Sequence, residues 1–321
     1  MIKWIKRVIA ILVIVIATLL AYVKLAMPNV GKAETLKIEA TPEMVKRGEY
    51  LANHVCVCID CHSKRDFSKF SGPLVKGTEG MGGEAFTPAF GFPGTFYSQN
   101  ITPYNLDKWT DGEILRAITC GVNKDGIALF PVMPYHSYGS MDKEDIKSII
   151  AYLRTLKPMK NDIPASKPDF PMNFLINTIP EKARFTSLPS RDNTVEYGKY
   201  LVNAASCSEC HTNFIKGKHV EGMDFAGSRE FDLPDGKKIF SANITPDKET
   251  GIGLWTEDMF IAKFKAFEDA GKLQDYRSPK DYQSMMPWNM YAGMDSSDLR
   301  AIYAYLKTLK PISNKVVLNL P

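Results

Sequence analysis

Two clusters of cysteine and histidine stand out in this 321-residue sequence, because each places three reactive side chains within one short segment. The first is Cys58-Ile-Asp-Cys61-His62, and the second is Cys207-Ser-Glu-Cys210-His211. Two thiols at this spacing suit redox exchange, zinc binding or covalent attachment of a prosthetic group, and the adjacent histidine adds a metal ligand. The identical spacing predicts two equivalent sites.

Covalent attachment of haem is the chemistry that this pattern predicts. Cys-x-x-Cys-His is the attachment signature of c-type haem, in which both thiols bond to one porphyrin and the histidine becomes a ligand of the iron. A zinc site would need two more ligands nearby, and each cluster offers a single histidine. A thioredoxin-like site would need alternating strands and helices, which the sequence lacks. We therefore predict two covalently bound haem c groups.

A methionine–proline pair follows each cluster and is the predicted source of the sixth iron ligand. Met133 and Met286 each lie in a loop ahead of the last helix of their half. A thioether ligand favours Fe(II) and raises the reduction potential. We predict that His62 and Met133 bind the first iron, and that His211 and Met286 bind the second. His136 is the alternative at the first iron and would lower its potential.

Four other cysteines and histidines are expected to have no ligand role. Cys56 and Cys120 are the remaining cysteines, and we predict buried, inert thiols, with a disulfide between them as the alternative. His54 and His219 are predicted to be surface or loop residues.

The sequence repeats itself at an offset of about 150 residues. Gly-x-Tyr-Leu, Cys-x-x-Cys-His, Asn-Ile-Thr-Pro, Trp-Thr and Met-Pro occur in this order in both halves. Segment 141–158 also matches segment 294–311 without a gap. This pattern predicts two tandem domains, 41–160 and 192–321. The proline-rich stretch 161–191 is predicted to be a semi-rigid linker whose apolar insert packs along one domain.

Helical periodicity dominates each half, so a mainly α fold is predicted. The last helix of each half opens with Asp-x-x-Asp, at 142–145 and 295–298, which resembles a capping box. The Gly- and aromatic-rich stretches 77–99 and 222–242 are predicted to be loops with a short hairpin. The predicted N-caps of other helices are Thr41, Thr110 and Thr256.

An apolar run near the N-terminus predicts a membrane anchor. It extends from Val8 to Met27 if Lys24 carries its ammonium group outward, which gives about 30 Å of helix. Residues 1–30 are therefore predicted to form one transmembrane helix, with a cleaved signal sequence as the alternative. In both cases the basic N-terminal flank stays in the cytoplasm and the body is exported.

Composition and charge indicate a globular protein and argue against nucleic-acid binding. The chain is 45% hydrophobic and 24% charged, which is ordinary for a globular protein. The net charge of +4 is supplied by the N-terminal segment, and the remaining body is neutral. A neutral body argues against nucleic acid as a partner, because phosphate binding needs clustered Lys and Arg.

The repeated motifs resemble those of class I di-haem cytochromes c built from two fused mono-haem domains. The pattern is similar to the membrane-associated cytochrome c subunits of periplasmic alcohol- and gluconate-type dehydrogenases. Those subunits often carry three haem domains, whereas this chain has two motifs, so the resemblance does not identify a partner enzyme. It implies that the cofactor-binding residues are Cys58, Cys61, His62, Met133, Cys207, Cys210, His211 and Met286.

The expected function is electron transfer without substrate chemistry. Two haems, tethered to a bacterial inner membrane by a single-pass anchor and exposed to the periplasm, would pass single electrons. The expected partners are a dehydrogenase or quinol-oxidising complex on one side and another cytochrome or a terminal oxidase on the other. The alternative is a di-haem redox enzyme of the peroxidase or thiosulfate-oxidising type. A methionine loop in both halves argues against that alternative, because a peroxidase needs an open iron.

Overall fold

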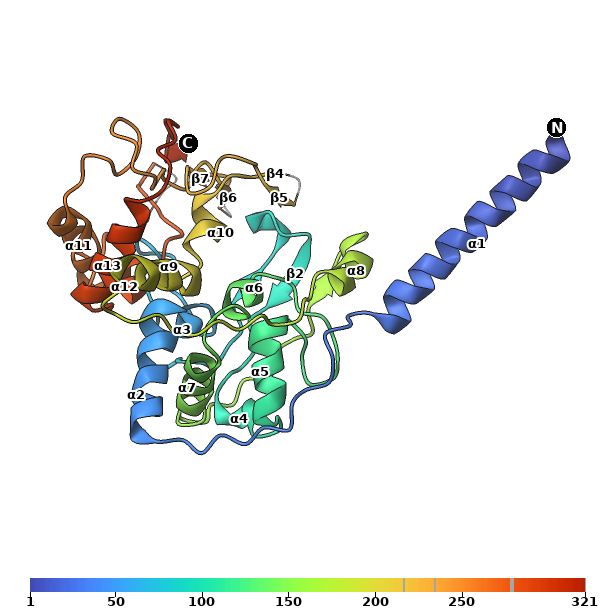
Figure 1. Ribbon diagram of the computed structural model, residues 1–321, viewed down its shortest axis with the longest axis horizontal. Helices are drawn as coiled ribbons and strands as arrows, with labels where there is room; N and C mark the ends of the chain where they lie inside the picture. Colours follow the sequence, from blue (N-terminus) through green and yellow to red (C-terminus); the bar gives the residue numbers. More distant parts are fainter. Residues whose placement is uncertain (216, 234, 278–279, 321) are drawn as a thin grey trace.

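A computed structural model describes residues 1–215, 217–233, 235–277 and 280–320. Helix α1 (Ile2–Ala26) projects from a body that holds the other elements, with the N-terminus at its far end (Figure 1). Its 25 residues span about 37 Å, and none of them is buried. Its most apolar window has a mean hydropathy of 2.8, so length and composition both suit a membrane span.

The first half of the body is built around two packed helices. Helix α2 (Pro42–Tyr50) packs against α7 (Lys143–Leu153), and α5 (Asp111–Cys120) packs against α7 as well. Gly48 makes the first contact possible, because a Cβ atom there would lie 1.8 Å from the carbonyl oxygen of Ser148. The two helix backbones therefore approach closely at this glycine.

The second half repeats this arrangement. Helix α9 (Thr194–Ala204) packs against α13 (Ser296–Leu306), and α11 (Glu257–Lys265) packs against α13. A Cβ atom at Gly198 would lie 1.9 Å from the carbonyl oxygen of Ala301. The Gly-x-Tyr-Leu motif of the sequence thus marks the same helix crossing twice.

Short helices complete both halves. A π-helical turn, η1 (Leu51–Val55), continues α2 and leads to the first cysteine cluster. The other short helices are α3 (Cys58–Cys61), η2 (Pro88–Phe90), α4 (Pro103–Leu106), α6 (Tyr135–Tyr138), α8 (Met172–Leu175), η3 (Ile176–Thr178), α10 (Cys207–His211), η4 (Ala270–Lys272) and α12 (Trp288–Tyr291).

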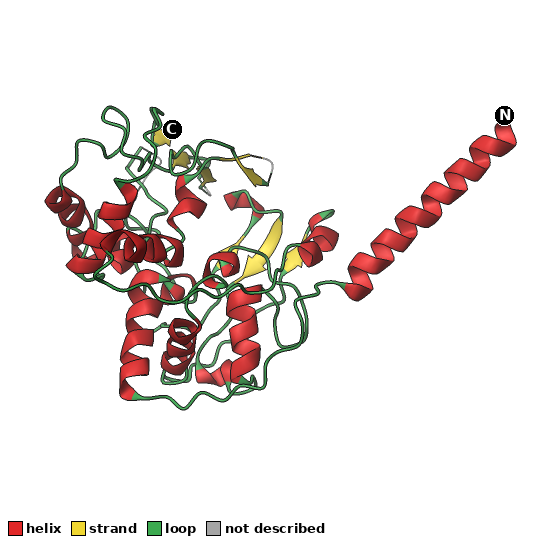
Figure 2. Ribbon diagram, viewed as in Figure 1, coloured by secondary structure: helices red, strands yellow, loops and turns green. Residues whose placement is uncertain are grey.

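Strands form a minor part of the fold and lie at the edges of the helical body (Figure 2). One antiparallel sheet has the order β1-β2-β3 and another the order β6-β7-β8, and β4 pairs with β5. The two predicted hairpins are confirmed as β1–β2 and β6–β7. The strands are β1 (Ala85–Phe86), β2 (Gly94–Tyr97), β3 (Lys167–Pro168), β4 (Phe214–Ile215), β5 (Lys218–His219), β6 (Glu230–Asp232), β7 (Lys238–Phe240) and β8 (Asn319–Leu320).

The predicted N-caps are confirmed at all three threonines. The Thr41 hydroxyl accepts a hydrogen bond from the Met44 amide, and Thr256 caps α11 in the same way. Thr110 forms a full capping box with Glu113, whose carboxylate accepts from the Thr110 amide at 2.8 Å.

The capping boxes predicted for α7 and α13 are wrong. Asp142 does cap α7 by accepting from the Glu144 amide at 2.7 Å, whereas Asp295 makes no such bond at α13. The second aspartate of each motif, Asp145 or Asp298, turns away from its cap and forms ion pairs with arginines. A charged partner binds a buried carboxylate more strongly than a backbone amide does.

The stretch between the halves follows the surface of the first half. Strand β3 pairs with β2, and the Arg184 amide donates to the Gly139 carbonyl at 2.7 Å. Ile176 is buried in a small apolar cluster with Phe96 and Ala128. The prediction that the apolar insert packs along one domain is therefore confirmed.

Candidate functional sites at the two cysteine clusters

Each cluster forms a short helix that begins after a strained residue. Val57 precedes α3 with φ +47°, and Ser206 precedes α10 with φ +53°. A positive φ is a strong outlier for the β-branched Val57. Such strain persists only where the surroundings fix the backbone, which is common at functional sites. The two halves therefore set up their clusters by the same unusual turn.

Both cluster histidines are oriented by a backbone carbonyl. His62 Nδ1 lies 2.6 Å from the Gln99 oxygen, and His211 Nδ1 lies 2.7 Å from the Ala242 oxygen. A carbonyl oxygen only accepts, so Nδ1 donates the proton and Nε2 keeps its lone pair for a metal. Burial lowers the pKa of both histidines, although the carbonyl bond opposes the shift. Each ring thus keeps Nε2 free to act as a metal ligand.

The Asn-Ile-Thr-Pro motif explains how these carbonyls are held, which sequence reasoning did not foresee. Gln99 and Ala242 directly precede the motif asparagines. In the first half, Asn100 Oδ1 accepts from the amide (2.9 Å) and hydroxyl (2.7 Å) of Thr102. Asn243 repeats both bonds with its own threonine at the same distances. The motif follows both cysteine clusters in the sequence, and this recurrence could have indicated that it supports the cluster histidines.

A close approach of two chain segments completes each histidine support. The Gly82 amide donates to the His62 carbonyl at 2.8 Å, and Gly227 makes the same bond to His211 at 2.6 Å. A Cβ atom at Gly82 would lie 2.5 Å from the Gln99 backbone. Only glycine allows this approach, so the histidine and its carbonyl acceptor are fixed as one unit.

The four cluster cysteines form no disulfide; Cys58, Cys61 and Cys207 are partly buried and Cys210 is exposed. Burial raises the pKa of Cys58, Cys61 and Cys207 to about 12. A reactive redox cysteine needs a lowered thiol pKa. The environment of these thiols therefore does not suit thioredoxin-like exchange.

The clusters differ in the charges around them. In the first, the Asp60 carboxylate pairs with Arg65 at 2.7 Å, and both side chains are buried. Burial raises the pKa of Asp60 despite the arginine charge. In the second, the equivalent Glu209 is half-exposed and lies 3.7 Å from Nε2 of the exposed His219. His219 thus lies at the surface, as predicted.

Both predicted methionine ligands lie in matching turns on the core. Met133 and Met286 are partly buried and pack against the main apolar cluster. The Tyr135 amide donates to the Met133 carbonyl, and the Trp288 amide to the Met286 carbonyl, both at 2.8 Å. The alternative ligand His136 is exposed.

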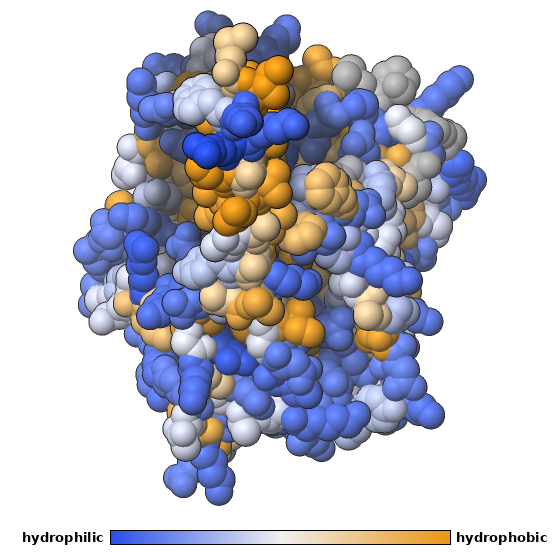
Figure 3. Space-filling model, turned by 90° about the vertical axis from the view of Figure 1, so that its right-hand side faces the viewer, coloured by the Kyte–Doolittle hydropathy of each residue, from blue (hydrophilic) through white to orange (hydrophobic). Residues whose placement is uncertain are grey.

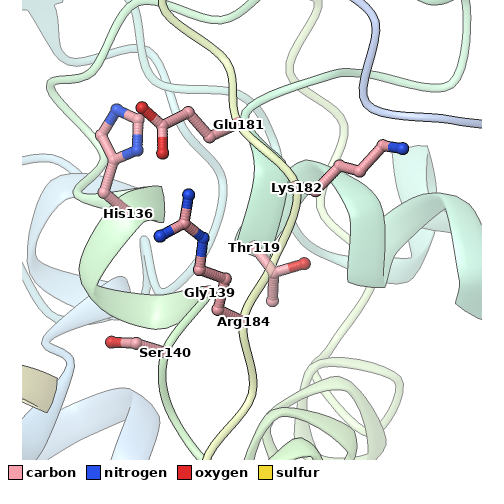
Figure 4. Close-up of a pocket in the computed structure, with 7 residues that line it drawn as sticks. All are labelled: Thr119, His136, Gly139, Ser140, Glu181, Lys182 and Arg184. Carbon is pink, nitrogen blue, oxygen red and sulfur yellow. The ribbon is translucent and has the colours of Figure 1, made fainter.

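His136 also lies among charged neighbours. It lines a small surface pocket with Glu181 and Arg184, and its ring lies near the Glu181 carboxylate (Figure 4). The ring is thus in polar surroundings, unlike the thioethers of the Met-Pro loops.

The two cysteines outside the clusters are free and buried. The Cys56 thiol lies 3.9 Å from the sulfur of Met141, and Cys120 lies near the Thr119 hydroxyl at 3.6 Å. These contacts agree with the predicted role as buried thiols.

Reciprocal hydrogen bonds join the two halves. The Tyr50 hydroxyl donates to Asp298 at 2.8 Å, and the Tyr200 hydroxyl, at the equivalent position, donates to Asp145 at 2.6 Å. Each hydroxyl also accepts a bond from the backbone amide that precedes the partner helix, at 3.1 and 3.3 Å. Burial and the aspartate charge raise the pKa of both tyrosines. These bonds fix the orientation of one cluster relative to the other.

His54 also belongs to this interface, so the prediction of a surface or loop position is wrong. It is half-buried in η1, and its Nδ1 lies 2.9 Å from the Met290 carbonyl of the second half. A Cβ atom on Gly293 would collide with its ring. The second half covers a residue that looks exposed when its own half is considered alone.

The local geometry fits a covalently bound c-type haem. Each cluster offers two unpaired thiols and a neutral histidine whose Nε2 is available. Among the described residues, no group of three or more His, Cys, Asp or Glu could hold a bare metal ion. The donor set at each cluster thus suits an iron porphyrin better than a zinc ion.

Comparison with known proteins agrees with this chemistry. Residues 195–310 match the model of the cytochrome c family. This segment is thus similar to a cytochrome c domain, and such a domain implies covalently bound haem c. The fold is mainly helical and is preceded by one apolar N-terminal helix.

The relatives are cytochrome subunits and a di-haem cytochrome. The cytochrome c subunit of alcohol dehydrogenase (quinone) from Gluconacetobacter polyoxogenes is 29% identical over 299 residues, covering 88% of this chain and 59% of the relative. The fructose dehydrogenase cytochrome subunit of Gluconobacter japonicus is 28% identical, covering 86% and 55%. A diheme cytochrome c-type of Cereibacter sphaeroides is 27% identical, covering 79% and 82%.

These matches confirm the resemblance drawn from the motifs. The chain is homologous to cytochrome c subunits of dehydrogenases, although it spans 59% of the length of the alcohol dehydrogenase subunit. The relatives are named as cytochrome subunits, which indicates an electron-transfer component rather than the substrate-oxidising enzyme.

Proposed function

We propose that this protein is a membrane-anchored di-haem cytochrome c that relays single electrons. The observation that carries the proposal is the duplicated histidine support: two Cys-x-x-Cys-His clusters, each with its imidazole held by a carbonyl at 2.6 or 2.7 Å. A cytochrome with one functional site would have no need of the second support.

The proposed ligand sets follow from the two halves. When bound, haem supplies reversible one-electron chemistry between Fe(III) and Fe(II). In the first half, Cys58 and Cys61 would bind the porphyrin covalently, while His62 and Met133 would hold the iron. Met133 is preferred to His136 because it packs on the core and repeats in the second half. The second set consists of Cys207, Cys210, His211 and Met286.

The surrounding protein fixes the ligands and the distance between the two groups. The carbonyl bonds hold each imidazole in the tautomer and orientation that can bind a metal. The tyrosine–aspartate bonds hold the halves in one orientation. Residues 41–160 and 192–321 are thus two domains of one rigid relay, with 161–191 as the connection.

The proposed location is the periplasmic face of a bacterial inner membrane. Helix α1 has the length and composition of a span. Most of the exposed large apolar side chains belong to this helix, and the view from the side toward which it projects shows apolar surface among mostly hydrophilic residues (Figure 3). The basic residues before the apolar run favour a cytoplasmic N-terminus. Anchoring keeps the haem domains near membrane-bound redox enzymes.

The proposed partners are a donor and an acceptor of single electrons. The related subunits serve dehydrogenases for alcohol, fructose and gluconate, which supports a dehydrogenase or quinol-oxidising complex as the donor. Another cytochrome or a terminal oxidase would accept the electrons.

Haem counting tests the proposal on matched variants. We expect two haems per chain in the wild type, both retained after denaturation and solvent extraction. Replacing Cys58 and Cys61 by serine should leave one, and replacing Cys207 and Cys210 by serine should also leave one. Both wild-type haems should titrate with one electron each and stay inert to peroxide. A wild-type count of one, or turnover of peroxide, would refute the di-haem relay.

A further inference from the structure

One segment of the first half docks on the loop that carries Met286. The Phe70 amide donates to the Gln274 carbonyl, and the Tyr276 amide donates to the Ser68 carbonyl, both at 2.7 Å. These bonds form an isolated antiparallel bridge between segments 68–70 and 274–276. The contact lies outside the reciprocal tyrosine interface.

Aromatic rings extend this contact toward the methionine loop. Phe70 is buried and stacks on Phe267 and Tyr282, with ring centroids 5.6 and 5.5 Å apart. Phe267 in turn stacks on Trp288 at 4.9 Å. A first-half side chain is thus packed into the ring cluster beside the Met-Pro turn.

Ser71 is the residue that reaches the turn itself. Its side chain is fully buried, and its hydroxyl donates to the carbonyl of Met286. The Ser71 hydroxyl oxygen also accepts a hydrogen bond from the Trp288 amide at 3.2 Å. The Ser71 amide donates to the Gln283 side chain at 2.7 Å. One hydroxyl of the first half therefore holds both sides of Pro287.

The backbone at Ser71 is strained, which shows that its surroundings fix it. Ser71 has φ +66°, and Gly72 follows with φ +56°. Left-handed backbone is uncommon and unfavourable for residues other than glycine, and it persists only where the surrounding structure over-determines it. Here the bonds to the methionine loop stabilise the strained conformation.

The Met133 loop shares only the internal part of this support. Its carbonyl accepts from the Tyr135 amide at 2.8 Å, as the Met286 carbonyl does from the Trp288 amide. In the part of the chain that the structure describes, no side chain of the second half hydrogen-bonds to Met133. The second half reaches this region through Asn203, whose amide group donates to the Ser137 carbonyl at 2.9 Å, four positions beyond Met133. Within the described residues, the cross-half bond to the methionine carbonyl itself is therefore found at Met286 and not at Met133.

We propose that Ser71 is a positioning residue for Met286, so that the first half controls the axial ligand of the second haem. This inference rests on the proposed role of Met286 as a ligand. The hydroxyl fixes the turn that presents the thioether. Without it, the Met286 carbonyl and the Trp288 amide lose a buried partner, and the thioether is displaced more easily.

The test uses the full-length two-haem protein with Ser71→Ala and Ser71→Gly. Both changes remove the hydroxyl, but glycine also relieves the positive φ, so at least one variant should fold. We expect added imidazole to displace one thioether at about fivefold lower concentration, the factor that corresponds to a hydrogen bond of about 1 kcal/mol. The potential of that site should fall, while the other site keeps its potential and spectrum.

Two control variants separate the possible failures. Ser148→Ala removes another buried hydroxyl, which donates only to the Glu144 carbonyl of its own helix, and should change neither site. Met286→Ala should abolish the thioether signal of the site that responds to Ser71. If Met286→Ala alters one site but both Ser71 variants leave it unchanged, or shift both sites equally, the positioning role is refuted. If Met286→Ala alters neither site, the ligand assignment and the positioning role both fail.

Discussion

The two halves agree in how they hold their histidines and differ in how they hold their methionines. His62 and His211 have the same carbonyl acceptor, glycine contact and asparagine clamp, all supplied from within one half. The Met286 turn, in contrast, is tied to Ser71 of the other half, whereas the Met133 turn is not. Each half therefore supports its own histidine, whereas the support of Met286 exists only when the two halves are packed together.

The largest effects are expected from removing the methionines one at a time. Met133→Ala and Met286→Ala should each remove about half of the thioether-to-iron absorption and lower one of two reduction potentials, because the replacement ligand favours Fe(III). Spectroscopy and redox titration of both variants measure this. His136→Ala is the control and should change neither value. If it alters the first site while Met133→Ala does not, His136 is the ligand there.

Glycine substitutions test whether the helix crossings are equivalent. Gly48→Ala and Gly198→Ala would place a methyl group less than 2 Å from the carbonyl oxygens of Ser148 and Ala301. Each should lower the free energy of unfolding by about 3 kcal/mol, because the helices must separate. Denaturant unfolding measures the loss, and Lys46→Ala, at an exposed position on α2, should have little effect. Unequal losses would show that the crossings differ.

Much of the fold could be predicted from the sequence because its signals are local. The threonine caps, both hairpins and the cysteine clusters depend on residues a few positions apart, and the structure contains them. The wrong predictions concern contacts between residues far apart in the sequence. The Asp145 carboxylate binds Arg47 of its own half and Tyr200 of the other, and His54 meets the second half. A sequence repeat does not indicate how its two copies face each other. The left-handed backbone of Val57 could not be predicted from the sequence, because valine disfavours that conformation.

Tyrosine substitutions test the reciprocal part of the interface. Tyr50→Phe and Tyr200→Phe each leave a buried aspartate with one donor fewer and should cost about 2 kcal/mol of stability, in equal amounts. Because the folded-state pKa of each tyrosine lies above its ordinary value of 10.0, this stabilisation is present below pH 10 and lost as the pH rises further. Unfolding experiments from pH 8 to 11 should show a smaller alkaline loss in the double variant.

The smallest effect on the two sites is expected from removing the anchor. A chain that begins at Lys32 keeps Glu34, whose carboxylate pairs with Lys143 at 2.6 Å and whose carbonyl packs on Gly112. It should lose the need for detergent and keep both haems with unchanged potentials. Solubility and redox titration check this. A changed potential would show that α1 acts on a haem site.

The exchange of tyrosines between the halves has the form of an isologous contact. Tyr50 meets Asp298 and Tyr200 meets Asp145, which is the pattern that a twofold axis produces between identical subunits. In a homodimer of identical single-domain subunits, every contact across the interface would occur twice. Any substitution near one methionine loop would then occur near the other as well. Fusion into one chain removes that constraint. The serine that supports a single methionine is an asymmetry that identical subunits could not have acquired.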